Sequence, residues 1–188
     1  VELFDPAGWL ADARLHGVED GDAVFQAGAA RPGPERVLPE TWLLVGLLKG
    51  PAFEMALRMA TELGVTRVLP VLAARSVATG DRRDRWGRVV EAAVQQSGRS
   101  RAPVVDGPRP LGDCLADVPA GMQLQLCVPG TDPVRPIVGP AAVMVGPEGG
   151  WAPAEQASAE GAGAWRVGLG PYVLRGDTAV AAALSRLR

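Results

Sequence analysis

Beyond residue 40 the chain alternates between short, uninterrupted apolar runs and longer segments in which apolar residues recur every three or four positions. Apolar runs of this kind are typical of strands buried on both faces of a sheet, and we expect strands at 42–48, 67–72, 102–105, 123–128, 141–145 and 165–169. The helical spacing predicts helices at 51–63, 82–97, 111–116, 153–160 and 177–187. Regular alternation of strand and helix predicts an α/β fold with a parallel sheet covered on both faces.

The first forty residues have a different texture. Short alternating segments at 1–4, 9–15 and 23–25 are separated by turn residues, as in β-hairpins. The stretch that follows them, rich in proline, glycine and charge, is typical of a linker. The sequence therefore predicts a small β unit over 1–40, too short for a core of its own, and an α/β domain over 41–188.

The composition is that of an ordinary globular protein of 188 residues, 47% hydrophobic and 21% charged. No apolar run has the length of a membrane span, and no basic-then-apolar leader opens the sequence, so we expect a cytoplasmic protein without a membrane partner. Cys114 and Cys127 show no CxxC spacing and are expected to be reduced core residues. His16 is the single histidine, which excludes histidine-based metal clusters, and no metal site is expected.

Positive charge is concentrated in one segment of a chain whose net charge is −2. Residues 81–101 contain six arginines and three acids, so the rest of the chain is distinctly acidic. A charge run of this kind is either the solvated face of a helix or a surface for RNA phosphates, and the pattern alone favours neither.

Two glycine-bearing turns, at 145–150 and 169–174, each follow a predicted strand and precede a helix. Glycines let backbone and ligand approach closely, and open α/β folds bind ligands at the carboxyl ends of their strands. Neither turn carries the lysine of a phosphate-binding loop, and neither forms a GxGxxG motif. The pair suits a ligand with an adenine and an amino-acid end, read by backbone amides and flanked by Val173 and Leu174.

Charged side chains accompany both turns. Glu148 lies between Pro147 and Gly149, which fix its direction, so the acid is expected to face the ligand. Arg175 either has a functional role or forms a salt bridge with an acid such as Glu148. Asp177 and the threonine after it suit the start of the last helix as capping residues.

Five segments, taken together and in order, resemble the bacterial small-subunit ribosomal RNA methyltransferases that modify N3 of a uridine in 16S rRNA, a family of the SPOUT superfamily. The segments are Leu-Lys-Gly at 48–50, Ala-Thr-Glu-Leu-Gly-Val-Thr-Arg at 60–67, Glu-Ala-Ala-Val-Gln-Gln-Ser-Gly-Arg-Ser at 91–100, Val-Gly-Pro-Glu-Gly-Gly at 145–150 and Leu-Gly-Pro-Tyr-Val-Leu-Arg-Gly-Asp-Thr-Ala at 169–179. The resemblance covers 41–188 and is specific only as a combination.

The resemblance implies a SPOUT-type parallel sheet whose C-terminal segment forms a deep trefoil knot. It also implies S-adenosyl-L-methionine (SAM) as cofactor, a homodimer, and 16S rRNA or the small ribosomal subunit as partner. Residues 1–40 would be part of a PUA-like β-barrel that helps to hold RNA.

The resemblance also assigns residues. Cofactor binding falls on Val128, Gly146, Pro147, Glu148, Gly149, Gly150, Leu169, Gly170, Val173, Leu174 and Thr178. For catalysis we expect Arg175 and Arg99 to stabilise the uracil anion or a nearby phosphate, and Glu62 or Glu148 to orient or accept the N3 proton; Glu62 could instead pair with Arg58 or Arg67. Contacts to RNA are expected from Lys49, Arg75, Arg82, Arg83, Arg85, Arg99 and Arg101.

Three departures from the family pattern keep other functions open. The usual N-terminal opening is missing, so the β-barrel is expected to be incomplete. Gly176-Asp177 stands where the family has Thr-Glu, and Lys49 is followed by Gly50-Pro51 instead of a polar residue. The alternatives are a non-catalytic RNA-binding assembly factor and a SPOUT methyltransferase that acts on another RNA.

Overall fold

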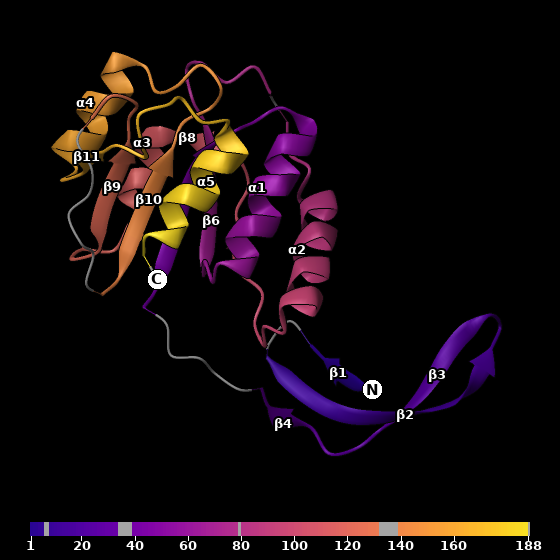
Figure 1. The fold of residues 1–188 in the computed structure, drawn as a ribbon. Coiled ribbons are helices and arrows are strands. Elements are labelled where there is room, and N and C mark those ends of the chain that lie inside the picture. Colours follow the sequence, from indigo (N-terminus) through magenta and orange to yellow (C-terminus); the bar gives the residue numbers. More distant parts are fainter. Residues whose placement is uncertain (6–7, 34–38, 79, 132–138, 188) are drawn as a thin grey trace.

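A computed structural model describes residues 1–188 except 6–7, 34–38, 79, 132–138 and 188. Two β-sheets organise the described residues: a small antiparallel sheet near the N-terminus and a large parallel sheet in the rest of the chain (Figure 1). The division agrees with the change of pattern near residue 40.

The large sheet has seven strands within the described residues, all paired in parallel. They are β5 (Thr41–Gly46), β6 (Arg67–Leu72), β7 (Val104–Val105), β8 (Arg109–Pro110), β9 (Gln123–Cys127), β10 (Ala141–Val145) and β11 (Trp165–Val167). Their order is β11-β9-β10-β5-β6-β7, and β8 also pairs with β6. The first described strand of the domain, β5, thus lies in the middle, so the chain builds the sheet outwards on both sides of it.

Helices cover both faces of this sheet (Figure 1). They are α1 (Gly50–Glu62), α2 (Arg83–Ser97), α3 (Leu111–Ala116), α4 (Pro153–Gly161) and α5 (Gly176–Ser185). In β5, Leu43 and Val45 pack with α1, α2 and α5, whereas Trp42 and Leu44 pack with α3 and α4. This two-residue alternation places two apolar cores on one strand, which explains why its apolar run is uninterrupted.

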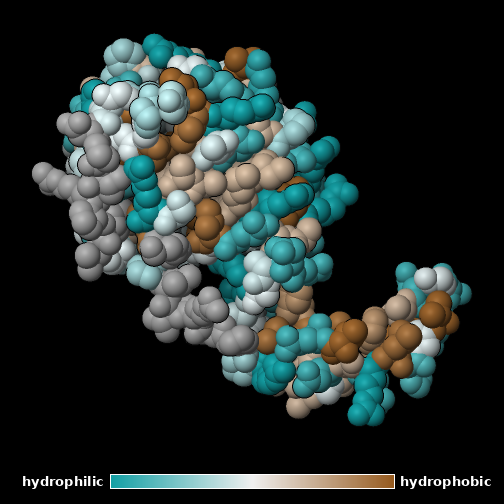
Figure 2. Space-filling view, in the orientation of Figure 1, coloured by the Kyte–Doolittle hydropathy of each residue, from teal (hydrophilic) through white to brown (hydrophobic). Residues whose placement is uncertain are grey.

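The small sheet contains β1 (Glu2–Phe4), β2 (Trp9–Glu19), β3 (Asp22–Ala27) and β4 (Arg31–Pro32). Asp20 and Gly21 join β2 to β3 with φ values of 51° and 91°, as a tight hairpin turn requires. The hairpin projects from the body of the molecule, and apolar side chains such as Leu15 (61% exposed) and Val18 (68%) line it (Figure 2). The predicted hairpin texture is confirmed, and both strands are longer than expected.

Most elements of the large domain follow the sequence pattern. The predicted strands at 67–72 and 141–145 and the helix at 111–116 have the observed bounds. The pattern did not predict β8, because two residues are too few for any periodicity to appear. Both Cys114 and Cys127 are free and buried, as expected.

The described residues contain neither a membrane-spanning helix nor a cluster of metal-binding side chains. None of the helices there is long and apolar enough to cross a lipid bilayer. No group of three or more histidine, cysteine, aspartate or glutamate side chains in this part of the chain is arranged to hold a metal ion.

We expect Gly46→Ala to destabilise the protein by about 1–3 kcal/mol, the usual range for overpacking. A Cβ atom at Gly46 would lie 2.4 Å from Cδ and 2.6 Å from the backbone nitrogen of Pro147, so the turn after β10 would have to move. Equilibrium unfolding in urea measures the change.

Gly87→Ala in α2 is the matched control, since a Cβ there meets no atom within 4 Å. It should stabilise the helix by about 0.5–1 kcal/mol. Equal unfolding midpoints for the two variants would show that the turn at Pro147 can move without loss of stability and that the fold does not require glycine at position 46.

Candidate functional site

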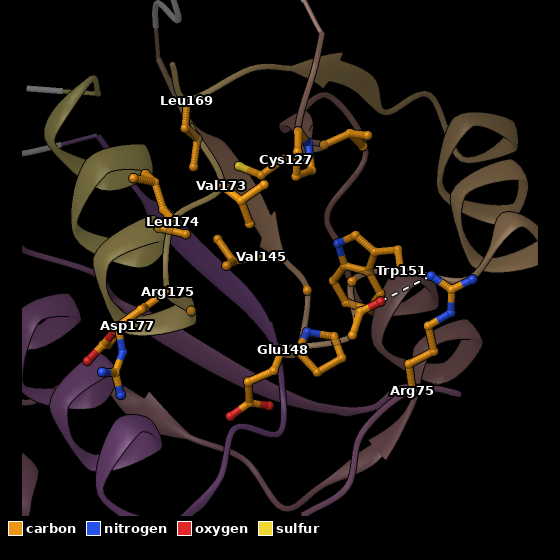
Figure 3. A pocket seen from close by; sticks show the side chains of 18 of the residues that line it. Arg75, Cys127, Val145, Glu148, Trp151, Leu169, Val173, Leu174, Arg175 and Asp177 are labelled. Atoms are coloured by element: carbon orange, nitrogen blue, oxygen red, sulfur yellow. Dashed lines mark hydrogen bonds between the residues drawn. The ribbon is translucent and has the colours of Figure 1, made fainter. Parts of the chain in front are cut away.

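A large pocket opens at the carboxyl ends of β9, β10 and β11 and at the start of α5 (Figure 3). Its volume is about 610 Å³, within the range of cofactor sites. Parallel sheets bind ligands at this edge, beside the point where neighbouring connections run in opposite directions. Both glycine-bearing turns line the pocket, so the structure brings together two segments that are twenty residues apart.

The turn at 146–150 is held by Arg75, which lies in the loop after β6 and also lines the pocket. The Arg75 guanidinium donates a hydrogen bond to the carbonyl oxygen of Gly149 at 3.0 Å, drawn as a dashed line in Figure 3. A Cβ atom at Gly149 would lie 2.9 Å from the Cβ of Arg75, so the close contact needs glycine. Within the turn, the Gly150 amide donates to the Pro147 carbonyl at 2.8 Å. The backbone of this wall is therefore fixed by protein contacts alone.

Glu148 is turned towards the start of α1. Its Oε1 accepts a hydrogen bond at 3.0 Å from the backbone amide of Lys49, the residue that precedes the helix. A carboxylate at a helix N-terminus is stabilised by the helix dipole and satisfies an amide without an intrahelical partner. Glu148 thus ties the turn after β10 to the loop after β5 and keeps its second oxygen for other contacts.

Apolar side chains form the inner wall of the pocket: Cys127, Val145, Leu169 and Leu174. Burial raises the pKa of Cys127 to about 12, so its thiol remains protonated at neutral pH. The wall is therefore suited to a flat apolar ring and presents no thiolate to it.

Trp151, directly after the glycines, supplies a buried donor. Its side chain is only 3% exposed, and its indole Nε1 has no hydrogen-bond partner among the described residues. Figure 3 shows this nitrogen on the edge of the ring that faces the pocket. A buried N–H without an acceptor is costly, so this group suits a polar atom of a bound ligand.

Arg175 stands at the rim, immediately before α5. Its guanidinium is exposed and makes no hydrogen bond or ion pair with the described residues, so the alternative of a salt bridge to Glu148 is not found. Figure 3 shows Arg175 and Glu148 on the same side of the pocket. A Cβ atom at Gly176 would lie 2.5 Å from Leu48, which places the start of α5 against the start of α1.

The second turn is more open. Tyr172 and Val173 are 80% and 82% exposed at the pocket rim. Thr178, expected to bind the cofactor, is exposed and is not among the residues that line the pocket. The backbone amide of Thr178 donates a hydrogen bond to Asp177 Oδ1 at 2.8 Å, within the first turn of α5. The structure therefore assigns Asp177, and not Thr178, to the pocket lining.

Glu62 and Arg99 do not join this pocket within one chain. Glu62 is the last residue of α1, about 20 Å along the helix from its start. Arg99 donates to the carbonyl oxygens of Thr61 and Val65 at 2.6 and 3.0 Å, where it satisfies the C-terminal end of the same helix. Our expectation that these two residues share a site with Arg175 is therefore not met by the single chain, because α1 separates them from it.

The basic residues expected to contact RNA fall into different environments. Arg83 pairs with Asp81 at 2.7 Å, and Arg85 donates to Glu54 at 3.0 Å. Such partners neutralise part of the arginine cluster and favour a solvated, ion-paired helix face for these two residues.

Of the other basic residues expected to contact RNA, two are available to a ligand and one packs against the protein. Lys49 and Arg82 are exposed and have no acidic partner among the described residues. Arg101 packs against the N-terminal sheet, since a Cβ atom at Gly8 would come within 2.7 Å of its Cγ.

Sequence reasoning missed several lining residues, among them Ala52, Cys127, Trp151, Gln156 and Asp177. Trp151 and Asp177 adjoin predicted residues and could have been included by extending each turn. Ala52 comes from α1, far away in the sequence, and only the packing of α1 against α5 brings it to the pocket.

The fold and the pocket define a class: α/β proteins with a pocket between glycine-rich turns at the carboxyl edge of a parallel sheet. More narrowly, the chain belongs to the RNA methyltransferase domain family, whose model matches residues 35–188.

Two curated relatives carry the name ribosomal RNA small subunit methyltransferase E. The protein of Mycobacterium bovis is 40% identical over 163 residues, which are 79% of this chain and 62% of the relative. The protein of Synechocystis sp. is 33% identical over 198 residues, covering 98% of this chain and 64% of the relative. The chain thus spans somewhat less than two thirds of the length of these relatives.

Solved structures agree with the fold. A ribosomal RNA small subunit methyltransferase E from Neisseria gonorrhoeae, bound to SAM, has a TM-score of 0.86 and 30% identity, covering 98% of this chain and 80% of its own. A methyltransferase from Legionella pneumophila has a TM-score of 0.89 at 24% identity, covering 99% of this chain and 81% of that one. A SpoU methyltransferase from Streptomyces viridochromogenes shares the fold at a TM-score of 0.56, 16% identity and coverages of 79% and 58%. The expected SPOUT-type α/β architecture is thereby confirmed.

Because burial raises the pKa of Cys114 to about 11 and that of Cys127 to about 12, neither thiol should react readily at pH 8 in the folded protein. We expect slow labelling by iodoacetamide under native conditions and rapid labelling of both after unfolding in urea, measured by mass spectrometry. Rapid native labelling of Cys127 would show that the inner wall of the pocket is open to solvent and its thiol ionised.

Proposed function

We propose that this protein is a SAM-dependent methyltransferase that methylates N3 of a uridine in 16S ribosomal RNA. The observation that carries the proposal is the pocket itself: two glycine turns around an apolar wall, an unpartnered buried N–H from Trp151, and a free arginine at the rim. The names of the relatives and the SAM bound to the gonococcal protein support the same activity.

The residues present fit this cofactor. The apolar wall and the amides of both turns suit an adenine ring, and the indole N–H of Trp151 suits a polar atom of the ribose or of the amino-acid end. When bound, SAM supplies a methyl group already activated on its sulfonium, so the protein needs to position the base and manage one proton.

Arg175 is assigned the electrostatic part of this task. An unpaired guanidinium beside the pocket can stabilise the negative charge that develops on the uracil as N3 loses its proton. Glu148 is assigned to orient or accept that proton through the oxygen that Lys49 does not use. It is preferred over Glu62, because Glu148 and Arg175 lie on the same side of the pocket.

Three further features belong to the proposal. The trefoil knot is supported by β11 pairing with β9 at the end of the sheet, while α5, next along the chain, returns to pack on α1 and β10. The homodimer is supported by the exposure of Tyr172 and Val173 at the pocket rim, and a partner copy would give Glu62 and Arg99 a route to an active site. The PUA-like barrel is supported by the antiparallel sheet of β1–β4, with residues 1–40 and 41–188 as separate domains.

The proposal also names the partner and the compartment. Substrate would be 16S rRNA or the small ribosomal subunit, so the protein would act in the cytoplasm. Mass spectrometric mapping of modified uridines in small-subunit rRNA from cells lacking the protein tests the reaction. A full complement of N3-methyluridine in those cells would overturn it, and absence of SAM binding in calorimetry would favour the non-catalytic assembly factor.

Arg175→Ala should reduce methyl transfer by two to three orders of magnitude, the range seen when one charge-stabilising group is removed. SAM affinity should stay within about twofold, because the guanidinium makes no contact that shapes the pocket. Single-turnover transfer of labelled methyl groups and calorimetry measure the two quantities. Turnover at the wild-type rate would refute the assignment.

Trp151→Phe should weaken SAM binding by about 2–10-fold, which corresponds to one neutral hydrogen bond. Trp42→Phe is the matched control, because the Trp42 indole N–H already donates to Glu40 at 2.7 Å. Both variants lose the same ring volume in the same apolar core, so both should lower the unfolding free energy. Equal SAM affinity of the two variants in calorimetry would contradict a bond from Trp151 to the cofactor.

A further inference from the structure

A second pocket, of about 350 Å³, lies beside the first, on the other side of the first turn of α1. We propose that it binds one nucleotide of the RNA strand next to the target uridine, with the base on an apolar floor and the phosphate between Lys49 and Arg82. The inference rests on the proposed methyltransferase function and names a binding site for its substrate.

The floor of this second pocket is apolar. Leu47, Leu48, Phe53 and Trp86 line it, and the rings of Phe53 and Trp86 pack 4.6 Å apart. Val77, 68% exposed, stands at the mouth. Phe53 and Trp86 are only 2% and 4% exposed, so Val77 offers most of the apolar surface that an unstacked base could contact. A volume near the lower limit of ligand pockets suits a single nucleotide and not a duplex.

The charge at its edge is positive. Glu54 is the acid among the lining residues, and Arg85 holds it in an ion pair with an N–O distance of 3.0 Å. Lys49 and Arg82 also line the pocket and have no acidic partner among the described residues. Two unpaired cations beside a neutralised acid are complementary to a phosphate group.

The two pockets share one wall. Lys49, at the edge of the second pocket, donates its backbone amide to Glu148 of the first. Leu48 of the second pocket abuts Gly176 of the first, with 2.5 Å between Leu48 Cδ2 and a Cβ built on Gly176. The first turn of α1 lies between the two pockets, since Ala52 lines the first and Gly50 and Phe53 line the second. A strand whose target base enters the first pocket would therefore pass its neighbouring nucleotide over the second.

Single-strand recognition of this kind agrees with the chemistry required. The target uracil must leave the base stack to expose N3. The base next to it then loses its stacking partner. An apolar floor for that neighbour compensates part of the unstacking free energy, so the second pocket would contribute to substrate affinity and leave the methyl-transfer step unchanged.

The test uses small ribosomal subunits from cells lacking the protein as substrate for the full chain. Lys49→Gln and Arg82→Gln should each raise KM by about 5–20-fold with kcat and SAM affinity within twofold, as expected for one lost phosphate contact. Arg88→Gln is the matched control: Arg88 is another exposed arginine of α2, lies outside both pockets, and should leave KM unchanged.

Two more measurements address the base. Ala78→Leu narrows the pocket without changing charge and should raise KM by a similar factor. Ultraviolet cross-linking of the bound subunit, mapped by mass spectrometry, should attach a nucleotide adjacent to the target to the peptide that contains Val77 or Trp86.

The outcomes separate the two proposals. If the wild-type protein methylates its substrate but the Lys49, Arg82 and Arg88 variants have equal KM values, the second pocket does not bind RNA and the methyltransferase function stands. A cross-link of this peptide to a protein of the subunit would likewise overturn the RNA assignment. If the wild-type protein neither binds SAM nor transfers a methyl group, the proposed function fails and the inference fails with it.

Discussion

The close approach of the turn after β10 to the end of β5 is the constraint on which the pocket depends. Gly46 must lack a side chain, because Pro147 occupies the space where a Cβ atom would stand. Once the turn is seated there, Glu148 reaches the Lys49 amide and Gly149 reaches the Arg75 guanidinium. The geometry of the C-terminal ligand wall is thus set by loops from the first half of the domain, which approach it only in the folded sheet.

Periodicity predicted the strand and helix order well, because buried parallel strands and amphipathic helices leave strong local patterns. It placed β6, β10 and α3 correctly and failed for β8, whose two residues carry no pattern. That the glycine turns line a pocket could be predicted, since each follows a strand at the carboxyl edge. The contribution of Ala52 could not, because no local signal reports which helix will pack beside a turn.

Charge was the hardest property to interpret from sequence. Arginines at 82, 83 and 85 look alike in the chain, yet two have acidic partners whereas Arg82 has none among the residues that the structure describes. Arg99 belongs to a segment that resembles a functional motif, but its bonds to Thr61 and Val65 hold the end of α1. Acidic or carbonyl groups distant in sequence decide whether an arginine supports the fold or remains available to a ligand. These partners cannot be inferred from net charge.

The protonated state of Cys127 has a chemical consequence for the proposed cofactor. A sulfonium methyl group alkylates thiolates, and the inner wall of the pocket contains a sulfur atom. Because burial keeps that thiol protonated well above neutral pH, it would be a poor nucleophile towards a methyl donor bound in the pocket. Burial would thereby protect the wall of the pocket from methylation by its own ligand.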